Sequence, residues 1–391
     1  MLNTPFSPWP SFSQEEADAV SRVVLSNKVN YWTGNECREF EKEFADWVGT
    51  DYAVALTNGT MALDVALKAL SISHGDDVIT TPRTFLASAS SIVTAGANPV
   101  FADVDLNSQV ITAESIKSVL TPNTKAVIVV HLAGMSAEMD DIMALSAECD
   151  FFVIEDCAQA HGAKYKGRSV GSIGHIGAWS FCQDKIITTG GEGGMVTTND
   201  KSLWSFMWSY KDHGKSYDAI YHNDHPPGFR WLHESFGSNC RMMEYQAVLG
   251  RIQLKCMAEW TAKRQANGNI IDQIASEFRC IRLVKVPDYI VHAEYKHYVF
   301  VEPDYLATGW SRDRIIDEIV KFDVPCFEGS CSEVYLEKAF NGTSWRPEVR
   351  LPNAVLLGKT SLMFLVHPTL TKVEMDKTAQ VIYSVLSMAS C

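Results

Sequence analysis

Short apolar runs and helical patterns alternate along the chain from about residue 53 to residue 155, and this alternation limits the fold more than any other feature. Strands separated by helices of about 10–15 residues favour a parallel sheet with helices packed over it. The predicted strands are Ala53–Thr57, Val78–Thr81, Val100–Val104, Ala126–His131 and Phe151–Glu155, and the predicted helices between them are Met61–Leu70, Phe85–Ala95, Ala113–Leu120 and Glu138–Cys149. The pattern predicts an α/β domain with a mainly parallel central sheet.

Two stretches that follow this region have the composition expected of loops. Glycines punctuate the chain after Asp156, up to a predicted strand at Ala178–Phe181. Residues 210–240 are dense in aromatic side chains and lack periodicity. Loops of that length in compact domains are usually functional or disordered. The aromatic content favours an ordered loop.

The last part of the chain predicts a second, smaller domain. A helical pattern runs from about Met242 to Phe278, with a break, and short strands and a helix opened by Ser311 follow it. We therefore expect a large α/β domain with an N-terminal arm over residues 1–260, and a small C-terminal α+β domain over residues 261–391.

Composition and charge argue against several classes of protein. A formal net charge of −13 without a Lys/Arg-rich stripe is unfavourable for a nucleic-acid partner. The ten cysteines form no CxxC pair, and the chain shows neither a leader-like segment nor an apolar run of membrane-spanning length. We therefore expect a cytoplasmic protein with no membrane partner, in which Cys326 and Cys331 are free thiols.

Polar side chains follow the apolar strand that ends at Glu155, at the end where open α/β sheets place their ligands. Asp156 lies there, with Gln159 and His161 just after it. Taken alone, such an acidic residue is more often part of a turn or a helix cap. Lys185 lies beside a glycine-dense turn and has apolar or small neighbours. Partial withdrawal from water would favour nucleophilic amine chemistry there, and a solvated surface charge is the alternative.

Other motifs were compared with the chain. Asn58-Gly59-Thr60 lies between a predicted strand and helix, where backbone N–H groups hold phosphate, although helix capping explains the same residues. No GxxxxGK[ST] loop, strand-linked GxGxxG, HExxH or GxSxG is present, which argues against the chemistry that each of them supports. His222, His225, His233 and Cys240 form a loose group without a recurring ligand spacing, so we expect no metal site.

Several motifs together resemble one family. They are Asn58-Gly59-Thr60, the Glu-Asp-x-Ala-Gln run at residues 155–159, and Ser180-Phe181 with Lys185 and the glycine-rich turn after it. With them the chain resembles the DegT/DnrJ/EryC1/StrS family of sugar aminotransferases. The resemblance extends over nearly the whole chain, from Tyr31-Trp32-Thr33-Gly34 to Val366-His367-Pro368-Thr369. An extra glycine at 190–191, and Cys240 where relatives commonly carry an aromatic residue, are departures from the family pattern.

The resemblance implies a fold-type-I transferase that depends on pyridoxal 5'-phosphate, and a homodimer whose chains share each active site. It implies that Lys185 holds the cofactor as a Schiff base and that Asp156 pairs with the pyridine nitrogen, which keeps the ring an electron acceptor. The other implied cofactor-binding residues are Gln159 near the ring hydroxyl, Gly59, Thr60 and Ser180 at the phosphate, Phe85 stacked on the ring, and Asn239 at the phosphate of the neighbouring subunit's cofactor.

The resemblance also implies transfer of an amino group from L-glutamate to a carbonyl-bearing sugar. Residues 211–217 and 226–231 are most similar to a subgroup that makes 8-amino-3,8-dideoxy-octulosonate for lipopolysaccharide, so 8-oxo-3-deoxy-octulosonate is the first predicted acceptor. A nucleotide-linked 4-keto-6-deoxy or 3-keto hexose is the alternative. Lys211, Lys215 and Arg230 are either candidates for binding the substrate's anionic part or solvated loop charges. A sugar dehydratase and a non-catalytic relative are further alternatives, and Lys185 argues against both.

Overall fold

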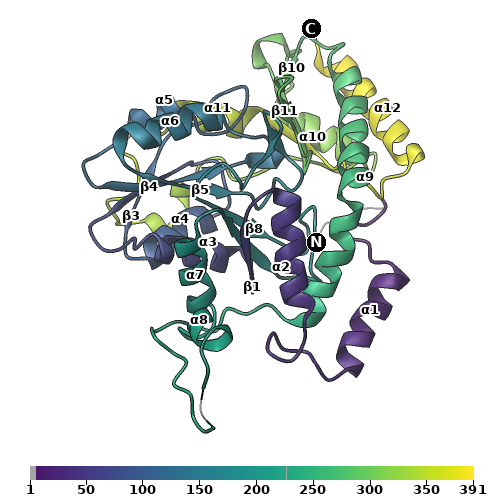
Figure 1. Cartoon of the computed structure of the whole chain (residues 1–391). Coiled ribbons are helices and arrows are strands. Elements are labelled where there is room, and N and C mark those ends of the chain that lie inside the picture. Colours follow the sequence, from purple (N-terminus) through teal and green to yellow (C-terminus); the bar gives the residue numbers. More distant parts are fainter. Residues whose placement is uncertain (1–5, 226) are drawn as a thin grey trace.

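The computed structural model describes residues 6–225 and 227–391, so the first residue of the Pro226-Pro227 pair lies outside the described residues. Figure 1 shows a central sheet covered by helices, a long helix α9 beside it, and a smaller part formed by the C-terminal residues. No helix in the described part of the chain combines the length and the apolar character that crossing a membrane requires. All ten cysteines are free thiols, including Cys326 and Cys331.

The large domain is built on a seven-stranded sheet in the order β1-β9-β8-β5-β4-β2-β3. Its strands are β1 (Tyr52–Leu56), β2 (Asp77–Thr80), β3 (Asn98–Phe101), β4 (Thr124–Val130), β5 (Phe152–Asp156), β8 (Ile176–Ser180) and β9 (Gly194–Thr198). Only β9 runs against the others, because it pairs antiparallel with both β1 and β8. The predicted mainly parallel sheet is confirmed, and the antiparallel strand directly after the glycine-rich turn is an addition to the prediction.

Helices cover both faces of this sheet. They are α2 (Glu36–Val48), α3 (Gly59–Ala69), α4 (Ala87–Thr94), α5 (Ala113–Lys117), α6 (Met139–Cys149) and α7 (Lys201–Tyr210). Successive side chains of β4 enter different cores: Ile128 packs in the core that contains α2 and α3, whereas Val127 and Val129 pack in the core that contains α5 and α6. Burial on both faces explains why this strand reads as a continuous apolar run.

Helix α9 (Glu244–Ala275) is one unbroken helix of 32 residues, so the predicted break within it is wrong. Its glycines serve close packing instead. A Cβ atom on Gly250 would lie 2.4 Å from the ring of Phe40, and one on Gly268 would lie 2.8 Å from His297. The domain boundary expected at residue 260 falls inside this helix, which continues from the large domain into the small one (Figure 1).

The small domain has the predicted α+β character. Its four strands pair antiparallel in the order β10-β12-β14-β13, and α10 and α12 pack their buried residues into the same core. These elements are β10 (Ile281–Leu283), β12 (His297–Val301), β13 (Cys326–Phe327), β14 (Ser361–Phe364), α10 (Arg312–Val320) and α12 (Lys372–Ala389), with α11 (Pro352–Thr360) preceding β14. Ser311 caps α10 as expected, because its side chain accepts a hydrogen bond from the Arg314 N–H.

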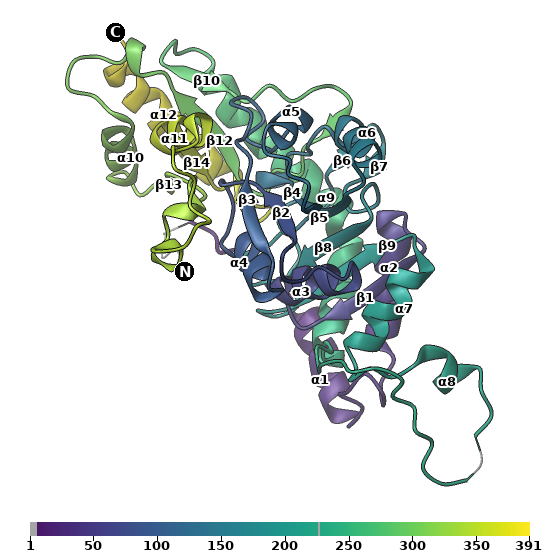
Figure 2. The same cartoon turned by 90° about the vertical axis from the view of Figure 1, so that its left-hand side faces the viewer.

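Two further parts flank these domains. Helix α1 (Gln14–Leu25) packs on α9, and a small sheet joins β6 (Lys164–Tyr165), β7 (Arg168–Ser169) and β11 (Ile290–Val291). Between α8 (Tyr217–Tyr221) and α9, residues 222–225 and 227–236 form a projecting loop, here called the arm, which Figure 2 shows extending away from the rest of the molecule. Its described aromatic side chains Phe229, Trp231 and Phe236 are exposed by 75%, 78% and 101%. Side chains of this kind usually have a partner surface.

Candidate active site

The carboxyl ends of three parallel strands bring the predicted site residues to one edge of the sheet. Strand β1 leads into Asn58-Gly59-Thr60, β5 ends at Asp156, and β8 ends at Ser180. A Cβ atom on Gly59 would lie 2.5 Å from the Cβ atom of Ser180, so the two chain segments are in direct contact. Open α/β sheets bind their ligands at this edge.

The N-terminus of α3 has free hydrogen-bond donors at this edge. The side chain of Asn58 caps the helix by accepting a hydrogen bond of 2.9 Å from the Met61 N–H. No described residue accepts a hydrogen bond from the N–H groups of Gly59 and Thr60. With the hydroxyls of Thr60 and Ser180 close by, these groups can hold a phosphate.

Asp156 is a buried carboxylate that forms no ion pair with a described residue. Its Oδ1 accepts a hydrogen bond of 3.1 Å from the Ala158 N–H, and its Oδ2 accepts one of 2.8 Å from the Ser88 hydroxyl. Ser88 is also hydrogen-bonded to Thr84, the residue before Phe85. The ring of Phe85 is 70% exposed, so an aromatic face is available in the segment that contacts Asp156.

Gln159 links the same edge to the start of the small domain. Its Oε1 accepts a hydrogen bond of 2.9 Å from the Ala133 N–H, which leaves the side-chain NH2 group free of described partners. The Ala133 carbonyl accepts a hydrogen bond of 2.9 Å from the Tyr295 N–H. Gln159 and Tyr295 are thereby connected through one residue.

Lys185 is half-buried, and its Nζ lies 5.2 Å from the centre of the Tyr295 ring. Within the described chain it forms no ion pair and no side-chain hydrogen bond. The Tyr295 hydroxyl donates to Asp184, next to Lys185. Desolvation would raise the pKa of Asp184, but the charge of Lys185 and the hydrogen bond from Tyr295 bring this pKa below its ordinary value. An amine free of direct partners thus lies beside an ionised carboxylate.

No sequence pattern indicated that Trp9, Tyr295 and Lys296 lie near Lys185. The indole Nε1 of Trp9 donates a hydrogen bond of 2.9 Å to the Lys185 carbonyl. Lys296 holds its Nζ 4.9 Å from the centre of the same Tyr295 ring and forms no ion pair with a described residue; burial lowers its pKa to about 8. No local pattern marks these residues, because the contacts connect positions far apart in the chain.

His161 lies behind Lys185 and is fully buried against Trp179 and Phe181. Burial, together with the charges of Lys185 and Arg264, lowers the pKa of His161 to about 3, so its imidazole is neutral. Neither ring nitrogen has a hydrogen-bond partner among the described residues. A neutral, unpaired imidazole is therefore part of the wall of the site.

The three candidate substrate-binding cations lie in very different surroundings. Lys211 is completely buried, its Nζ forms an ion pair of 2.7 Å with Glu41, and it lies 3.8 Å from the centre of the Tyr31 ring. The expectation that Lys211 contacts substrate therefore needs correction, because its charge is already enclosed and paired. Lys215 pairs with Asp212 at 3.2 Å over the Trp32 ring, and Arg230 is exposed on the arm.

Asn239 is exposed at the base of the arm, where its backbone pairs with Asp212. It is close in sequence to Arg241, which forms an ion pair of 2.5 Å with Asp212. Cys240 between them is buried, with its Sγ 3.4 Å from the Met61 sulfur. The side chains of Cys240 and Arg241 and the backbone of Asn239 fix the segment to the body, and the side chain of Asn239 is left accessible.

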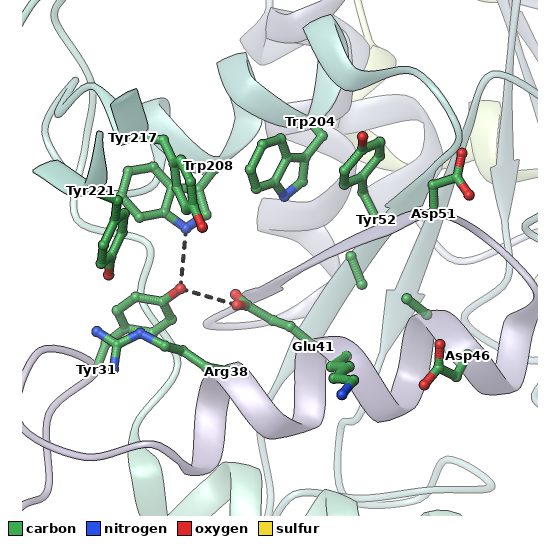
Figure 3. Close-up of a pocket in the computed structure, with 13 residues that line it drawn as sticks. Tyr31, Arg38, Glu41, Asp46, Asp51, Tyr52, Trp204, Trp208, Tyr217 and Tyr221 are labelled. Carbon is green, nitrogen blue, oxygen red and sulfur yellow. Dashed lines mark hydrogen bonds between the residues drawn. The ribbon is translucent and has the colours of Figure 1, made fainter. Parts of the chain in front are cut away.

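A pocket of about 520 Å³ lies elsewhere, between α2, the start of β1, α7 and α8. Figure 3 shows its aromatic wall, in which the Tyr31 hydroxyl accepts a hydrogen bond from Trp208 and donates one to Glu41. The pocket includes Asp51 and Tyr52 at the amino end of β1, whereas Asn58–Thr60 follow its carboxyl end. This pocket is therefore distinct from the sheet edge that carries Lys185 and Asp156.

In the described part of the chain, only His131, Glu155 and Cys157 meet the geometry of a three-ligand metal group. The Glu155 carboxylate already accepts N–H groups from Gly171, Ile173 and Gly174, and it pairs with His131 at 2.9 Å. Its two oxygens are thus occupied in fixing the loop at residues 171–174. The histidines at 222, 225 and 233 and Cys240 do not form a group of this kind among the described residues.

Comparisons with known proteins agree with this geometry. The model of the DegT/DnrJ/EryC1/StrS aminotransferase family matches residues 10–383. GDP-perosamine synthase of Escherichia coli O157:H7 is 38% identical over 67% of this chain and 68% of its own length. The UDP-N-acetyl-3-dehydro-alpha-D-glucosamine 3-aminotransferase of Acidithiobacillus ferrooxidans is 41% identical over 62% of this chain and 63% of its own length. The solved aminotransferase of Psychrobacter cryohalolentis is 63% identical, covers 98% of this chain and 99% of its own, and superposes with a TM-score of 0.97.

The family, its solved members and the sheet topology together establish a fold-type-I enzyme that uses pyridoxal 5'-phosphate. The residues at the sheet edge fit this cofactor, since they include free N–H donors for a phosphate, a buried carboxylate and a lysine without an ion pair. The two relatives described above, GDP-perosamine synthase and the 3-dehydro-glucosamine aminotransferase, are named for sugars. The chain therefore belongs to the DegT/DnrJ/EryC1/StrS family and is a pyridoxal-phosphate-dependent sugar aminotransferase.

Proposed function

We propose that the enzyme moves the amino group of L-glutamate to the carbonyl of a nucleotide-linked keto sugar. The observation that carries this proposal is the convergence of a free helix N-terminus, the Asp156 carboxylate and the unpaired Lys185 amine on one sheet edge. The relatives named for GDP-linked and UDP-linked sugars support a nucleotide-linked acceptor. The octulosonate acceptor expected from the sequence stays a prediction.

Each predicted residue has a proposed role toward the cofactor. Gly59, Thr60 and Ser180 would hold its phosphate, because their donors meet at the N-terminus of α3. Asp156 would face the pyridine nitrogen, and Gln159 would offer its free NH2 group to the ring hydroxyl. The exposed ring of Phe85 would cover one face of the cofactor. When bound, pyridoxal phosphate supplies an electron sink and stores the amino group between the two substrates.

Lys185 would act as the covalent anchor and as the acid–base group. Its Nζ would take the proton from the substrate carbon that bears the amino group and return it on the cofactor side. Asp184 and Tyr295 support this role, since the ionised carboxylate is adjacent to the amine and Tyr295 holds it in place. The buried and neutral His161 adds no second charge near the amine.

Lys296 is the proposed anchor for a glutamate carboxylate. Its ammonium lies over the same ring as that of Lys185 and has no ion-pair partner among the described residues. Charge-assisted hydrogen bonds between an ammonium and a carboxylate are strong in partly buried sites.

The proposed acceptor site includes a second copy of the chain. The arm projects away from its own body, and its exposed aromatic side chains need a surface to cover them. In a two-fold dimer each arm would lie on the other chain, where Asn239 would reach the cofactor phosphate. Arg230 on the arm would pair with the diphosphate of the sugar nucleotide, because guanidinium groups bind phosphates with two parallel hydrogen bonds.

The test starts with visible absorbance of the purified protein with pyridoxal phosphate, before and after adding L-glutamate, for the natural chain and for Lys185→Ala. We expect the absorbance of the lysine-bound cofactor to disappear with glutamate as 2-oxoglutarate forms, and to be absent in the variant. Keto sugars linked to UDP or GDP and 8-oxo-3-deoxy-octulosonate are then offered as acceptors. Amine product without an equal amount of 2-oxoglutarate would reject L-glutamate as the donor, and conversion of the keto sugar without any amine product would reject transamination.

A further inference from the structure

We propose that Thr84 and Ser88 are positioning residues that form a two-hydroxyl relay to Asp156 and hold its carboxylate ionised and correctly aimed. The inference rests on the proposed function, in which Asp156 faces the pyridine nitrogen. Neither hydroxyl needs to touch the cofactor. Each acts through the carboxylate.

The relay consists of two hydrogen bonds of ordinary length between buried groups. The Ser88 Oγ lies 2.8 Å from Asp156 Oδ2, and the Thr84 Oγ1 lies 2.8 Å from the Ser88 Oγ. Thr84 and Ser88 are each 1% exposed, and Asp156 is 7% exposed. Water therefore competes little for these hydroxyls, and their mutual bonds are stronger than they would be at the surface.

Chemistry fixes the direction of both bonds. An ionised carboxylate only accepts hydrogen bonds, so the Ser88 proton must point at Asp156 Oδ2. The Ser88 oxygen is then free to accept, and the proton between the two hydroxyls must come from Thr84. This direction, from Thr84 to Ser88 to Asp156, depends on an Asp156 carboxylate that only accepts hydrogen bonds. The relay thus stabilises the charged form of the carboxylate.

Few other groups support this charge. Asp156 has no ion-pair partner in the described chain, and besides Ser88 only the Ala158 N–H donates to its side chain. A carboxylate that loses one of two donors becomes more basic. Its interaction with a protonated pyridine nitrogen would then be weaker, and the ring would hold its positive charge less firmly. The Ser88 hydroxyl therefore protects the charged pair on which the electron-accepting ring depends.

Helix capping does not explain these hydroxyls. Helix α4 begins at Ala87 after Leu86, and no side chain caps it. The Ser88 hydroxyl donates to Asp156 instead, and the Thr84 hydroxyl is hydrogen-bonded to Ser88. On the same helix the buried hydroxyl of Ser91 has no partner at all among the described residues. Of these two buried serines one turn apart, the one that reaches Asp156 has side-chain partners and the other has none among the described residues.

The segment that carries the relay is fixed from outside. Arg83 is fully buried; its Nε and Nη2 donate to Gln109 Oε1 at 3.2 and 3.0 Å, and its Nη1 donates to the Ser332 hydroxyl at 2.9 Å. Arg83 therefore ties the loop before α4 to the small domain. With its backbone held next to Thr84, the first hydroxyl of the relay keeps its orientation, and Phe85 keeps its place.

The experiment compares Ser88→Ala, Ser88→Thr, Thr84→Val and the matched control Ser91→Ala with the natural chain. Pyridoxal phosphate affinity, the pH midpoint of the visible absorbance change of the cofactor-bound protein, and the rate of the glutamate half-reaction are measured. For Ser88→Ala we expect about tenfold weaker cofactor binding and an about tenfold slower half-reaction. The pH midpoint should rise, because a ring with one positive charge fewer lets Lys185 Nζ hold its proton more tightly.

Thr84→Val should shift the cofactor affinity, the pH midpoint and the half-reaction rate in the same direction but by less. Ser88→Thr should keep the values of the natural chain, since threonine also carries a hydroxyl at this position. Ser91→Ala should leave them unchanged. An unaltered pH midpoint in Ser88→Ala with cofactor bound would overturn the relay. If the natural chain itself fails to bind pyridoxal phosphate, the proposed function is wrong as well, so the two failures are distinguishable. Should Ser88→Ala not fold, Thr84→Val decides.

Discussion

Gly59 and Ser180 approach so closely that a Cβ atom on Gly59 would lie 2.5 Å from the Cβ atom of Ser180. The contact joins the N-terminus of α3 to the end of β8, the two elements that we propose to bind the cofactor phosphate. A glycine at position 59 therefore serves two purposes: it allows the close approach to Ser180, and its N–H group is one of those that we propose to bind the phosphate.

Gly59→Ala should destabilise the protein by about 1–3 kcal/mol, because an added methyl group must push apart two backbone segments. It should also weaken pyridoxal phosphate binding, since the N–H groups at the helix start move with the backbone. Unfolding by denaturant and spectroscopic titration measure the two effects. Gly59→Ala combined with Ser180→Gly should recover part of the stability but not the affinity. Equal stability of Gly59→Ala and the natural chain would contradict the close contact.

Sequence periodicity predicted the central sheet well, because strands buried on both faces are short continuous apolar runs. Ile128 and Val127 belong to different cores, yet both are apolar. The same reasoning missed β9, which starts at Gly194 directly after a turn of glycines, and it placed a break in α9. Gly250 and Gly268 look like interruptions, but each meets a large side chain of another element.

The site was predictable where its residues follow strands and was not where contacts are distant. Asp156 and Ser180 follow recognisable strands, so the sheet edge could be inferred. Lys211 and Glu41 are 170 residues apart, and no local pattern shows that the lysine is buried and paired. Lys296 likewise reaches the site of Lys185 only through the packing of the small domain against the large one.

Lys211→Met should lower the free energy of unfolding by about 3 kcal/mol, because it leaves the Glu41 carboxylate without its ion-pair partner in a largely buried place. Adding Glu41→Gln should recover much of this loss. The control is Lys215→Met, which should cost less than Lys211→Met, because Asp212 keeps its ion pair with Arg241 and its hydrogen bond from the Trp32 indole. A stable Lys211→Met enzyme with a raised KM for the sugar would instead return Lys211 to the substrate site.

Lys296→Met should raise the KM for L-glutamate about tenfold or more, because the donor carboxylate loses a charge-assisted partner. Burial lowers the pKa of Lys296 to about 8, so the natural chain should also lose glutamate affinity as the pH rises through 8 and the ammonium loses its proton. Lys296→Arg should keep the charge and extend binding to higher pH. Glutamate titrations of the visible absorbance at pH 7 and pH 9 measure both effects, and a pH-independent affinity would reject the anchor.

His297 should stabilise the fold in a pH-dependent way. It is ion-paired with Glu294 at 3.0 Å and with Asp272 at 2.9 Å, and although burial opposes its charge, these carboxylates raise its pKa to about 10. A raised pKa gives stability that is complete below the ordinary histidine value near 6.5 and is lost as the pH rises toward 10. His297→Gln should therefore cost about 3 kcal/mol at pH 6 and much less at pH 10. Denaturant unfolding at both values tests this, and an equal cost would exclude the charged histidine.

Mixed dimers test whether Asn239 serves its own active site or that of a second chain. Lys185→Ala and Asn239→Ala should each abolish most activity alone. In the proposed dimer each site takes Lys185 from one chain and Asn239 from the other. A mixed pair therefore contains one site in which both residues are replaced and one site in which both are natural. Random pairing makes half of the dimers mixed, so coexpression should restore about a quarter of the natural activity. If Asn239 served its own chain, every site would lack one residue and no activity would return. Light scattering of each variant confirms the dimer before the comparison, because a pair that cannot form would also remain inactive.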